Sequence, residues 1–364
     1  MSSNDLRLIV LDTAKDLGEK INKNLQEIRN TSENFIVPVN NVRFSNGEGK
    51  VRIEETVRDK DLYILSDVGN YGITYKLHGM VHNMSPDEHF QDIKRVISAT
   101  SGHAGKVTVV MPLLYQARQH KRKGRESLDC AIALQELEKL GVDDIITFDA
   151  HDPNVANAIP KLPFESFYPT YTILDILIDK EDVSNLIVVS PDMGAMERTR
   201  YYAEMLGCDA GVFYKRRDLS KVVDGKNPIV EHIYMGVDVK DKNIIVVDDM
   251  ISSGQSMIEV ASELKHRGAK NIYLVATFAL FTDGADMFRE SYNRGEFTKL
   301  YSTNLSYVPE DVINEEWFEN VDCSMQVASI LNNLNAKESI HSILHYGKKE
   351  IFERMERKKH NQWK

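Results

Sequence analysis

A pair of adjacent carboxylates followed by a serine- and glycine-rich turn is the residue pattern best suited to chemistry in this chain. Asp248 and Asp249 come directly after the apolar run Ile244–Val247. The turn that follows contains Ser252, Ser253, Gly254, Gln255 and Ser256. Ligands bind at the carboxyl ends of parallel strands, and a turn that opens a helix offers backbone N–H groups to a phosphate. Two carboxylates suit the vicinal hydroxyls of a sugar, so the pattern indicates a ribose-phosphate pocket, although the same residues could simply cap a strand and a helix.

A dense basic run in the first half of the chain could bind an anion. It begins with Arg118 and Gln119, continues through Lys121–Arg125, and follows the predicted strand Val107–Met111. Because the protein is acidic as a whole, positive charge gathered after one strand suggests a site for an anion such as a nucleotide polyphosphate. A solvated loop would have the same composition, so the run alone leaves both interpretations open.

A second basic segment, Lys215–Arg217, follows the predicted strand Gly211–Tyr214 and precedes a polar loop at 218–227. Transfer of a phosphoryl-type group needs little covalent chemistry from a protein, but it needs positive charge where negative charge develops. Lys215 and Arg217 could supply that charge when the loop closes over the phosphates. Taken alone, these residues favour an ordinary basic surface turn.

Three further polar side chains follow predicted strands. Asp149 and His151 follow Ile145–Phe148, and Asp192 follows Leu186–Ser190. A carboxylate and an imidazole in such positions could hold a Mg²⁺ ion that also binds phosphate oxygens and water. One histidine and scattered acids do not specify a metal, so the spacing alone favours polar surface residues.

A short segment near residue 45 could recognise a purine. Phe44 could stack on the base, while Asn46 offers an amide and Glu48 an acceptor to its edge. The alternative is a hairpin turn built on Asn46 and Gly47, which the residues alone favour.

The elements that must position these side chains alternate between β-forming runs and helices. This alternation predicts parallel α/β sheets with right-handed crossovers. Several runs are apolar without alternation, as in strands covered on both faces. Helices are predicted at 128–140, 196–206 and 258–267, each ending before a glycine. The predicted strands are Leu6–Leu11, Phe35–Val39, Asp61–Leu65, Val107–Met111, Ile145–Phe148, Leu186–Ser190, Gly211–Tyr214, Ile244–Val247, Ile272–Thr277 and Lys299–Ser302.

The first five predicted strands and the last five indicate two similar α/β domains, 1–163 and 164–310. A helical tail at 311–364 is expected to follow them. Prolines cluster near the expected boundary, between Ala158 and Pro169. The segment Gly69–His89 interrupts the alternation and is interpreted as a long loop or a short helical excursion. The highly charged end of the tail is typical of a solvated helix face or a fraying terminus.

Composition limits the classes of protein to which the chain can belong. The chain has 364 residues, of which 42% are hydrophobic and 27% charged, as in an ordinary globular protein of two domains. Its net charge of −10 argues against nucleic-acid binding, which normally requires a basic face. The sequence shows no signal-peptide pattern or apolar run long enough to span a membrane, and its three cysteines are widely spaced. We therefore expect a soluble, cytoplasmic protein without a membrane partner.

The segment from Val247 to Ser256 resembles the phosphoribosyl-binding motif of ribose-phosphate pyrophosphokinases (PRPP synthetases) and of type I phosphoribosyltransferases. Further blocks, which occur in the right order between residues 5 and 310, favour the first family. These blocks are Phe44–Glu48, Tyr115–Gln119, Asp149–His151, Ser190–Gly194 and Tyr214–Arg217. Each block is weak evidence alone, but together in this order they are strong evidence for the family.

The resemblance implies an α/β fold of two similar domains with parallel-sheet, phosphoribosyltransferase-like (Rossmann-type) architecture. It implies an enzyme of nucleotide biosynthesis that transfers the β,γ-diphosphoryl group of Mg·ATP to the C1 hydroxyl of D-ribose 5-phosphate, giving PRPP and AMP. Members of the family assemble as symmetric oligomers, so the resemblance also implies a homo-oligomer built from dimers, of which a hexamer is one form.

The resemblance also assigns roles to individual residues. Lys215 and Arg217 would be catalytic, and His151 and Asp192 would hold Mg²⁺. Residues that bind ATP would be Phe44, Asn46, Glu48, Arg118, Gln119 and His151. Residues that bind ribose 5-phosphate would be Asp192, Asp248, Asp249, Ser252, Ser253, Gly254, Gln255 and Ser256.

The chain departs from the family pattern in the phosphate turn. Ser252 stands where the family commonly has an acid and Gln255 where it has a glycine, so we expect the Cβ of Gln255 to strain the turn if the backbone there has positive φ. Ala195 also replaces a glycine. These changes keep open a second interpretation, a non-catalytic regulatory paralogue of the synthetase. A phosphoribosyltransferase that consumes PRPP is the third, and the adenine-loop and Lys-Arg-Arg blocks argue against it.

Overall fold

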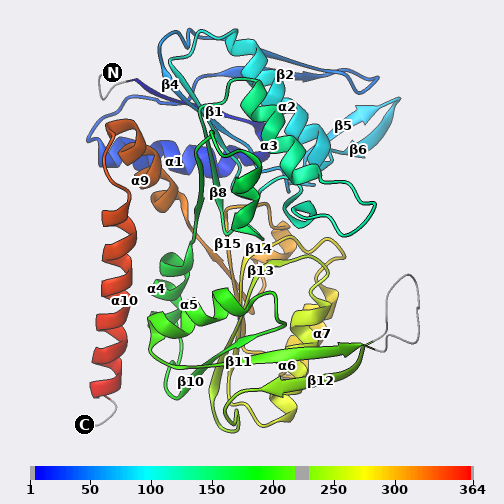
Figure 1. The fold of residues 1–364 in the computed structure, drawn as a ribbon, viewed down its shortest axis with the longest axis vertical. Helices are drawn as coiled ribbons and strands as arrows, with labels where there is room; N and C mark the ends of the chain where they lie inside the picture. The colour runs from blue at the N-terminus through cyan, green and yellow to red at the C-terminus, as the bar shows by residue number, and fades with distance from the viewer. Residues whose placement is uncertain (1–4, 218–228, 362–364) are drawn as a thin grey trace. The chain divides into compact units, whose positions relative to one another are not determined.

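The computed structural model describes residues 5–217 and 229–361, and the chain divides into two compact units (Figure 1). Within the described residues, unit 1 comprises 5–169, 304–309 and 322–343, and unit 2 comprises the rest. The C-terminal segment thus differs from the expected separate tail at 311–364. Its strand β16 (Phe318–Val321) completes the sheet of unit 2, and its helix α9 (Ser324–Ala336) packs in unit 1 against α1 (Lys15–Ile28).

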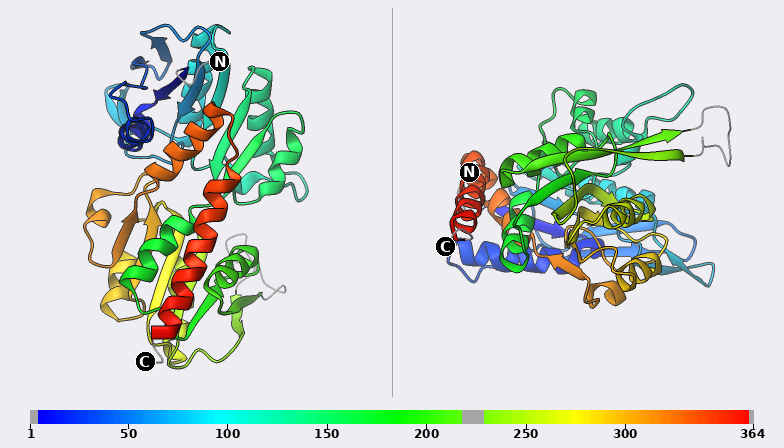
Figure 2. Two further views of the ribbon diagram at one scale, coloured as in Figure 1. Left: turned by 90° about the vertical axis from the view of Figure 1, so that its left-hand side faces the viewer. Right: turned by 90° about the horizontal axis from the view of Figure 1, so that it is seen from below.

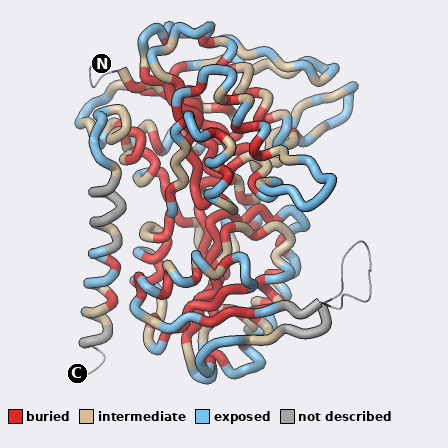
Figure 3. The backbone as a smooth tube through the Cα atoms, in the orientation of Figure 1, coloured by how far each residue is buried: buried red, intermediate tan, exposed pale blue. Residues whose placement is uncertain are grey.

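Unit 1 is built on a sheet whose strands are all parallel and follow the order β1-β4-β7-β8-β9. Every residue of β4 and β8 is buried, as expected for central parallel strands that are covered on both faces (Figure 3). The strands are β1 (Leu6–Val10), β4 (Asp61–Leu65), β7 (Lys106–Val110), β8 (Asp144–Phe148) and β9 (Phe164–Phe167). Besides α1 and α9, the unit contains α2 (Pro86–Thr100), α3 (Asp129–Lys139) and short 3₁₀ turns at Asp12–Ala14, Ala117–Gln119 and Pro153–Ala158.

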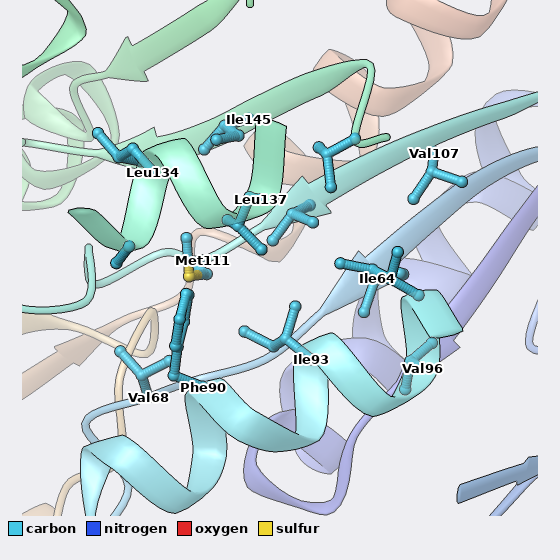
Figure 4. Close-up of a cluster of buried hydrophobic side chains, with 14 of the residues drawn as sticks. Ile64, Val68, Phe90, Ile93, Val96, Val107, Met111, Leu134, Leu137 and Ile145 are labelled. Carbon is cyan, nitrogen blue, oxygen red and sulfur yellow. The ribbon is translucent and has the colours of Figure 1, made fainter. Parts of the chain in front are cut away.

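The core of unit 1 lies between this sheet and two of its helices (Figure 4). Phe90, Ile93 and Val96 of α2 and Leu134 and Leu137 of α3 are buried against the strands. Helix α2 starts where the sequence specifies it, because Ser85 and Glu88 form a reciprocal capping box and Pro86 occupies the first turn.

Two hairpins lie outside the main sheet of unit 1. One pairs β2 (Val39–Arg43) with β3 (Gly49–Ile53), and the other pairs β5 (Thr74–Leu77) with β6 (Met80–Asn83). The expected loop or helix at Gly69–His89 is therefore wrong in its centre, where His78 and Gly79 both have positive φ and form the tight turn that twisted hairpins favour.

The predicted strand Phe35–Val39 is also wrong. Apart from Val39, which begins β2, this segment forms only an isolated bridge between Ile36 and Leu8, with backbone bonds on either side of it. Pro38 has no N–H group and cannot continue a ladder, so the chain turns away and starts β2.

Unit 2 is built on a sheet in the order β12-β11-β10-β13-β14-β15-β16, parallel except for the edge strand β12. All eight residues of β14 are buried. The remaining strands are β10 (Leu186–Ser190), β11 (Asp209–Arg217), β12 (Ile229–Met235), β13 (Asn243–Ile251), β14 (Ile272–Ala279) and β15 (Lys299–Thr303).

The order of these strands reverses at β10. The chain runs from β10 through α5 to β11 on one side, and later from β13 through α6 to β14 on the other. Right-handed crossovers then place α5 and α6 on opposite faces of the sheet, as Figures 1 and 2 show. The helices are α4 (Thr170–Lys180), α5 (Met196–Leu206), α6 (Gln255–His266), α7 (Asp286–Asn293), α8 (Glu310–Ile313) and α10 (His341–Asn361). Over the described residues, no helix is both long and apolar enough to cross a membrane.

The charged end of the chain forms α10, which packs on α4. Ile351 and Met355 of α10 are buried, and Arg354 pairs with Asp175 and Asp179 of α4. The charged run is thus an amphipathic helix with one anchored side.

Within unit 1, a buried carboxylate that follows β4 binds the segment 304–309. Asp67, just after β4, accepts hydrogen bonds from Ser306 Oγ at 3.0 Å, Tyr307 N at 2.7 Å and Gly69 N at 2.9 Å. Burial raises the pKa of Asp67 to about 6, although these hydrogen bonds act in the opposite direction.

The raised pKa predicts a pH dependence of stability. The folded state holds the Asp67 proton more tightly than the unfolded state, so this carboxyl favours folding below its unfolded pKa and loses that contribution as pH rises through about 6. Between pH 3.5 and 7.5 we expect the wild type to lose about 3 kcal/mol of unfolding free energy relative to Asp67→Asn. Urea denaturation of both proteins at several pH values measures this difference. Parallel pH profiles would contradict the prediction.

Candidate active site

Three neighbouring strands of unit 2 bring the predicted residues of this unit to one edge of its sheet. β10 lies between β11 and β13, and all three run parallel. The paired register ends at Val189 with Val246 on one side of β10 and at Ser190 with Val212 on the other. The turn after β10, which contains Asp192, therefore begins beside the later residues of β11 and β13. This edge is the switch point of the sheet, where ligands bind in open α/β folds.

The two carboxylates lie at the end of β13, in the described part of the strand. Asp249 is buried and Asp248 is about one-quarter exposed at its side chain. Burial and the adjacent Asp249 carboxyl raise the pKa of Asp248 above its ordinary value, and Arg198 at 4.0 Å partly offsets this. Carboxylate oxygens accept hydrogen bonds, so two adjacent carboxyl groups suit recognition of the two hydroxyls of a diol.

The turn after β13 is shaped by Gly254. Its φ is +81°, and a Cβ built there would lie 2.2 Å from the Phe288 ring, so only glycine fits. The carbonyl of Gly254 accepts from Met257 and Ile258, which starts α6. The N–H groups of the first helical turn have no intrahelical acceptor, and the helix dipole makes this end attractive to a phosphate.

The unusual residues of the turn do not distort it. Gln255 is the first residue of α6 and has no positive φ, so the strain that its Cβ suggested does not arise. Its side-chain amide donates to Glu259 at 2.9 Å. Ser252 is joined to Thr282 through their hydroxyls at 3.0 Å and through a backbone bond from Thr282 N at 3.1 Å.

Asp192 lies in the turn after β10 and is exposed. Its Oδ1 accepts from Gly194 N at 2.7 Å and Ala195 N at 3.3 Å. Oδ2 has no hydrogen-bond partner among the described residues, so it is available to a ligand.

The backbone of Lys215 and Arg217 belongs to the last part of β11, which pairs with β12 and contains a bulge between Arg216 and Arg217. The side chains of these residues lie outside the described part of the structure. The polar loop expected at 218–227 also lies outside it.

Unit 1 places its predicted nucleotide residues after β7 and β8. Arg118 and Gln119 lie in the 3₁₀ turn Ala117–Gln119 and are exposed. His151 follows β8 and is also exposed, and its ring lies 5.3 Å from that of the buried His120. Asp149 is buried, so among these polar residues the imidazole of His151 is the more accessible group.

The segment 44–48 forms the turn of the β2–β3 hairpin, as the residues alone favoured. Phe44 N donates to Glu48 O at 2.8 Å, and Gly47 has φ of +92°. Asn46 donates its side-chain amide to Glu48 at 2.9 Å. Phe44 is 47% exposed, so its ring is free to stack on a ligand.

The residues present fit a magnesium ion held mainly by substrate. No three His, Cys, Asp or Glu side chains within 5–217 and 229–361 gather to hold a metal by themselves. Mg²⁺ at phosphate-transfer sites keeps several waters and takes only one or two carboxylates besides phosphate oxygens. The available Oδ2 of Asp192 is a ligand of this kind.

Two residues without a predicted role also contribute to the edge in unit 2. Arg198 of α5 lies near Asp248, and Thr282 holds Ser252. Both come from elements distant in sequence from the turn, and only the fold of the sheet brings them there. The one feature of the sequence that could have pointed to a role for Arg198 is its position at the start of a helix that follows β10.

Comparisons with known proteins place this geometry in a family. Residues 6–141 match the family described as the N-terminal domain of ribose phosphate pyrophosphokinase, and residues 172–297 match the family described as the phosphoribosyl transferase domain.

Curated relatives are ribose-phosphate pyrophosphokinases. The Haemophilus ducreyi protein is 29% identical over 77% of this chain and 81% of its own length, and that of Pasteurella multocida is 32% identical over 67% and 71%. The crystal structure of phosphoribosylpyrophosphate synthetase from Mycobacterium smegmatis shares the fold, with a TM-score of 0.77 at 21% identity over 92% of this chain and all of that one. The chain therefore belongs to the ribose-phosphate pyrophosphokinases, a family of enzymes.

Proposed function

We propose that this enzyme transfers the β,γ-diphosphoryl group of Mg·ATP to the C1 hydroxyl of D-ribose 5-phosphate, giving PRPP and AMP. The observation that carries the proposal is the edge of the unit 2 sheet. There, the paired carboxylates in the last part of β13, the helix-opening glycine turn after it and the backbone of Lys215 and Arg217 in the last part of β11 lie on either side of β10.

Ribose 5-phosphate would bind at the β13–α6 turn. Asp248 and Asp249 would hold the ribose hydroxyls, and the turn from Ser252 to Ser256 would bind the 5-phosphate through backbone N–H groups and serine hydroxyls. Support comes from the positive φ of Gly254, which lets the backbone open the helix at this point. Arg198 would keep the carboxyl pair oriented.

ATP would bind to unit 1. Phe44 would stack on the adenine, Asn46 and Glu48 would recognise its edge, and Arg118 and Gln119 would contact the nucleotide together with His151. We propose His151 in unit 1 and Asp192 in unit 2 each as a ligand of Mg²⁺, an ion that when bound neutralises charge on the phosphates. The exposure of Phe44, Arg118 and His151 supports this assignment.

The transfer itself requires alignment and positive charge. The C1 oxygen of the sugar forms a bond to the β-phosphorus of ATP, the bond from that phosphorus to the bridging α,β-oxygen breaks, and AMP leaves with that oxygen. Lys215 and Arg217 would stabilise the charge that develops on the transferred group. By analogy with the family, we also propose a homo-oligomeric assembly.

Separate calorimetric titrations with ribose 5-phosphate and with Mg·ATP test this function. The proposal predicts saturable binding of each ligand and AMP formation only when both are present. A folded protein that binds neither ligand would contradict the proposal and favour a regulatory paralogue. AMP formation from PRPP and adenine instead would indicate a phosphoribosyltransferase.

A further inference from the structure

The β5–β6 hairpin of unit 1 contacts the turn at 44–48, which we call the base loop (Figure 1). The backbone N–H of His78, at the hairpin tip, donates to the carbonyl of Ser45 at 2.9 Å. A Cβ built at Gly47 would lie 3.3 Å from Leu77 Cδ1 and 3.5 Å from Tyr75 Oη. One face of the hairpin therefore lies directly against the base loop.

The same hairpin is anchored to α2 through a carboxylate. Tyr75 Oη donates to Glu88 Oε1 at 2.8 Å, and His82 Nε2 lies 3.1 Å from Glu88 Oε2. The rings of Tyr75 and His82 meet edge to face across the two strands. Glu88 is itself fixed by the capping box with Ser85, so the hairpin is held at a rigid helix start.

Helix α2 also holds the strand that leads into the base loop. The buried Asp92 accepts from Arg43 at 2.7 Å and from Asn41 at 3.1 Å. The Arg43 guanidinium also lies over the Tyr75 ring, 5.6 Å from its centre. The base loop is thus fixed from two directions, while Phe44 remains exposed.

We infer that the β5–β6 hairpin holds the base loop in the conformation that binds the nucleotide base, and that Leu77 and Tyr75 are positioning residues for ATP. The inference rests on the proposed function. An exposed turn that must order when a ligand arrives loses affinity through conformational entropy, and a second hairpin packed against it removes that cost in advance. The hairpin thereby sets affinity and base discrimination without touching the reacting atoms.

The test replaces Leu77 by alanine and measures steady-state kinetics for both substrates. We expect the KM for ATP to rise about tenfold and the preference for ATP over GTP to fall by a similar factor, because the base loop loses its support. The kcat and the KM for ribose 5-phosphate should stay unchanged, since neither depends on the base loop.

Val81→Ala is the matched control. Val81 is 72% exposed and pairs with Lys76, which alternates with Tyr75 and Leu77 and therefore belongs to the opposite face of the hairpin. The Val81→Ala substitution removes apolar volume from the same hairpin but from the face that does not contact the base loop. Tyr75→Phe removes the hydroxyl that donates to Glu88 and lies near Gly47. It should raise the KM for ATP about threefold, which keeps the test usable if Leu77→Ala does not fold.

The outcomes separate the inference from the proposed function. If the wild type forms no AMP from the two substrates, the proposed function fails. If the wild type is active and Leu77→Ala and Tyr75→Phe both behave like Val81→Ala, the positioning role is overturned. An equal rise in the KM of both substrates would also overturn it, because that result indicates general distortion.

Discussion

Lys215→Ala should lower the kcat for AMP formation about a thousandfold. The negative charge that develops on the transferred group would lose a stabilising cation, and preorganised charge is the main source of catalysis in such transfers. The backbone of residue 215 belongs to the last part of β11, the strand adjacent to β10. Rapid-quench measurement of AMP at saturating substrates gives the rate directly.

Binding of ribose 5-phosphate separates this effect from a loss of structure. The affinity of Lys215→Ala for the sugar should stay within about twofold of the wild type, since the β13–α6 turn is unaltered. Lys240→Ala is the control, because it removes one exposed positive charge before β13, at the opposite edge of the same sheet. If Lys215→Ala retained full activity, the assignment of its catalytic role would be wrong.

Gly254→Ala should destabilise unit 2 and abolish tight binding of the sugar phosphate. The added Cβ would meet two atoms of the Phe288 ring at 2.2 and 2.3 Å, and alanine at φ +81° adds about 1 kcal/mol of backbone strain. Phe288 cannot move away easily, because it is fully buried and stacked on Trp317. We expect a total loss of about 3 kcal/mol and an approximately hundredfold weaker affinity for ribose 5-phosphate.

Comparison with Gly284→Ala separates the steric effect of the added Cβ at Gly254 from the backbone strain of a positive φ. Gly284 has φ of +80°, nearly the same as Gly254, but nothing lies within 4 Å of its Cβ position. It should therefore cost only about 1 kcal/mol and leave the sugar affinity unchanged. Thermal unfolding and calorimetry of both variants compare the two positions. Equal effects of the two substitutions would show that close packing at Gly254 does not shape the phosphate turn.

The sequence predicts the central strands and several helices because their physical causes are local. β10 is continuous, apolar and buried on both faces, and α5 ends at Gly207, whose φ of +60° closes the helix. The sequence does not predict the β5–β6 hairpin, because each strand has only four residues and half of these residues are polar. Its only clear signal is the alternation of Tyr75 and Leu77 with exposed residues around a His-Gly turn.

Long-range contacts cannot be predicted in this way. Nothing near Asp248 in sequence indicates that Arg198 lies beside it, since the strand order places them together. Likewise, the C-terminal segment contributes to both units because its elements pack against parts of the chain that are distant in sequence, as α9 packs against α1. Gln255 is an example of a wrong local expectation. The sequence suggests backbone strain at Gln255, but the residue of the turn that has positive φ is Gly254.

The most direct test of the account follows the products by ³¹P NMR. The purified enzyme is incubated with ATP, Mg²⁺ and ribose 5-phosphate, and a parallel sample omits the sugar. Diphosphoryl transfer predicts AMP and a sugar C1-diphosphate in equal amounts, with no ADP, and no reaction without the sugar. ADP together with a sugar bisphosphate, or ATP that stays intact in the presence of the sugar, would contradict the central claim.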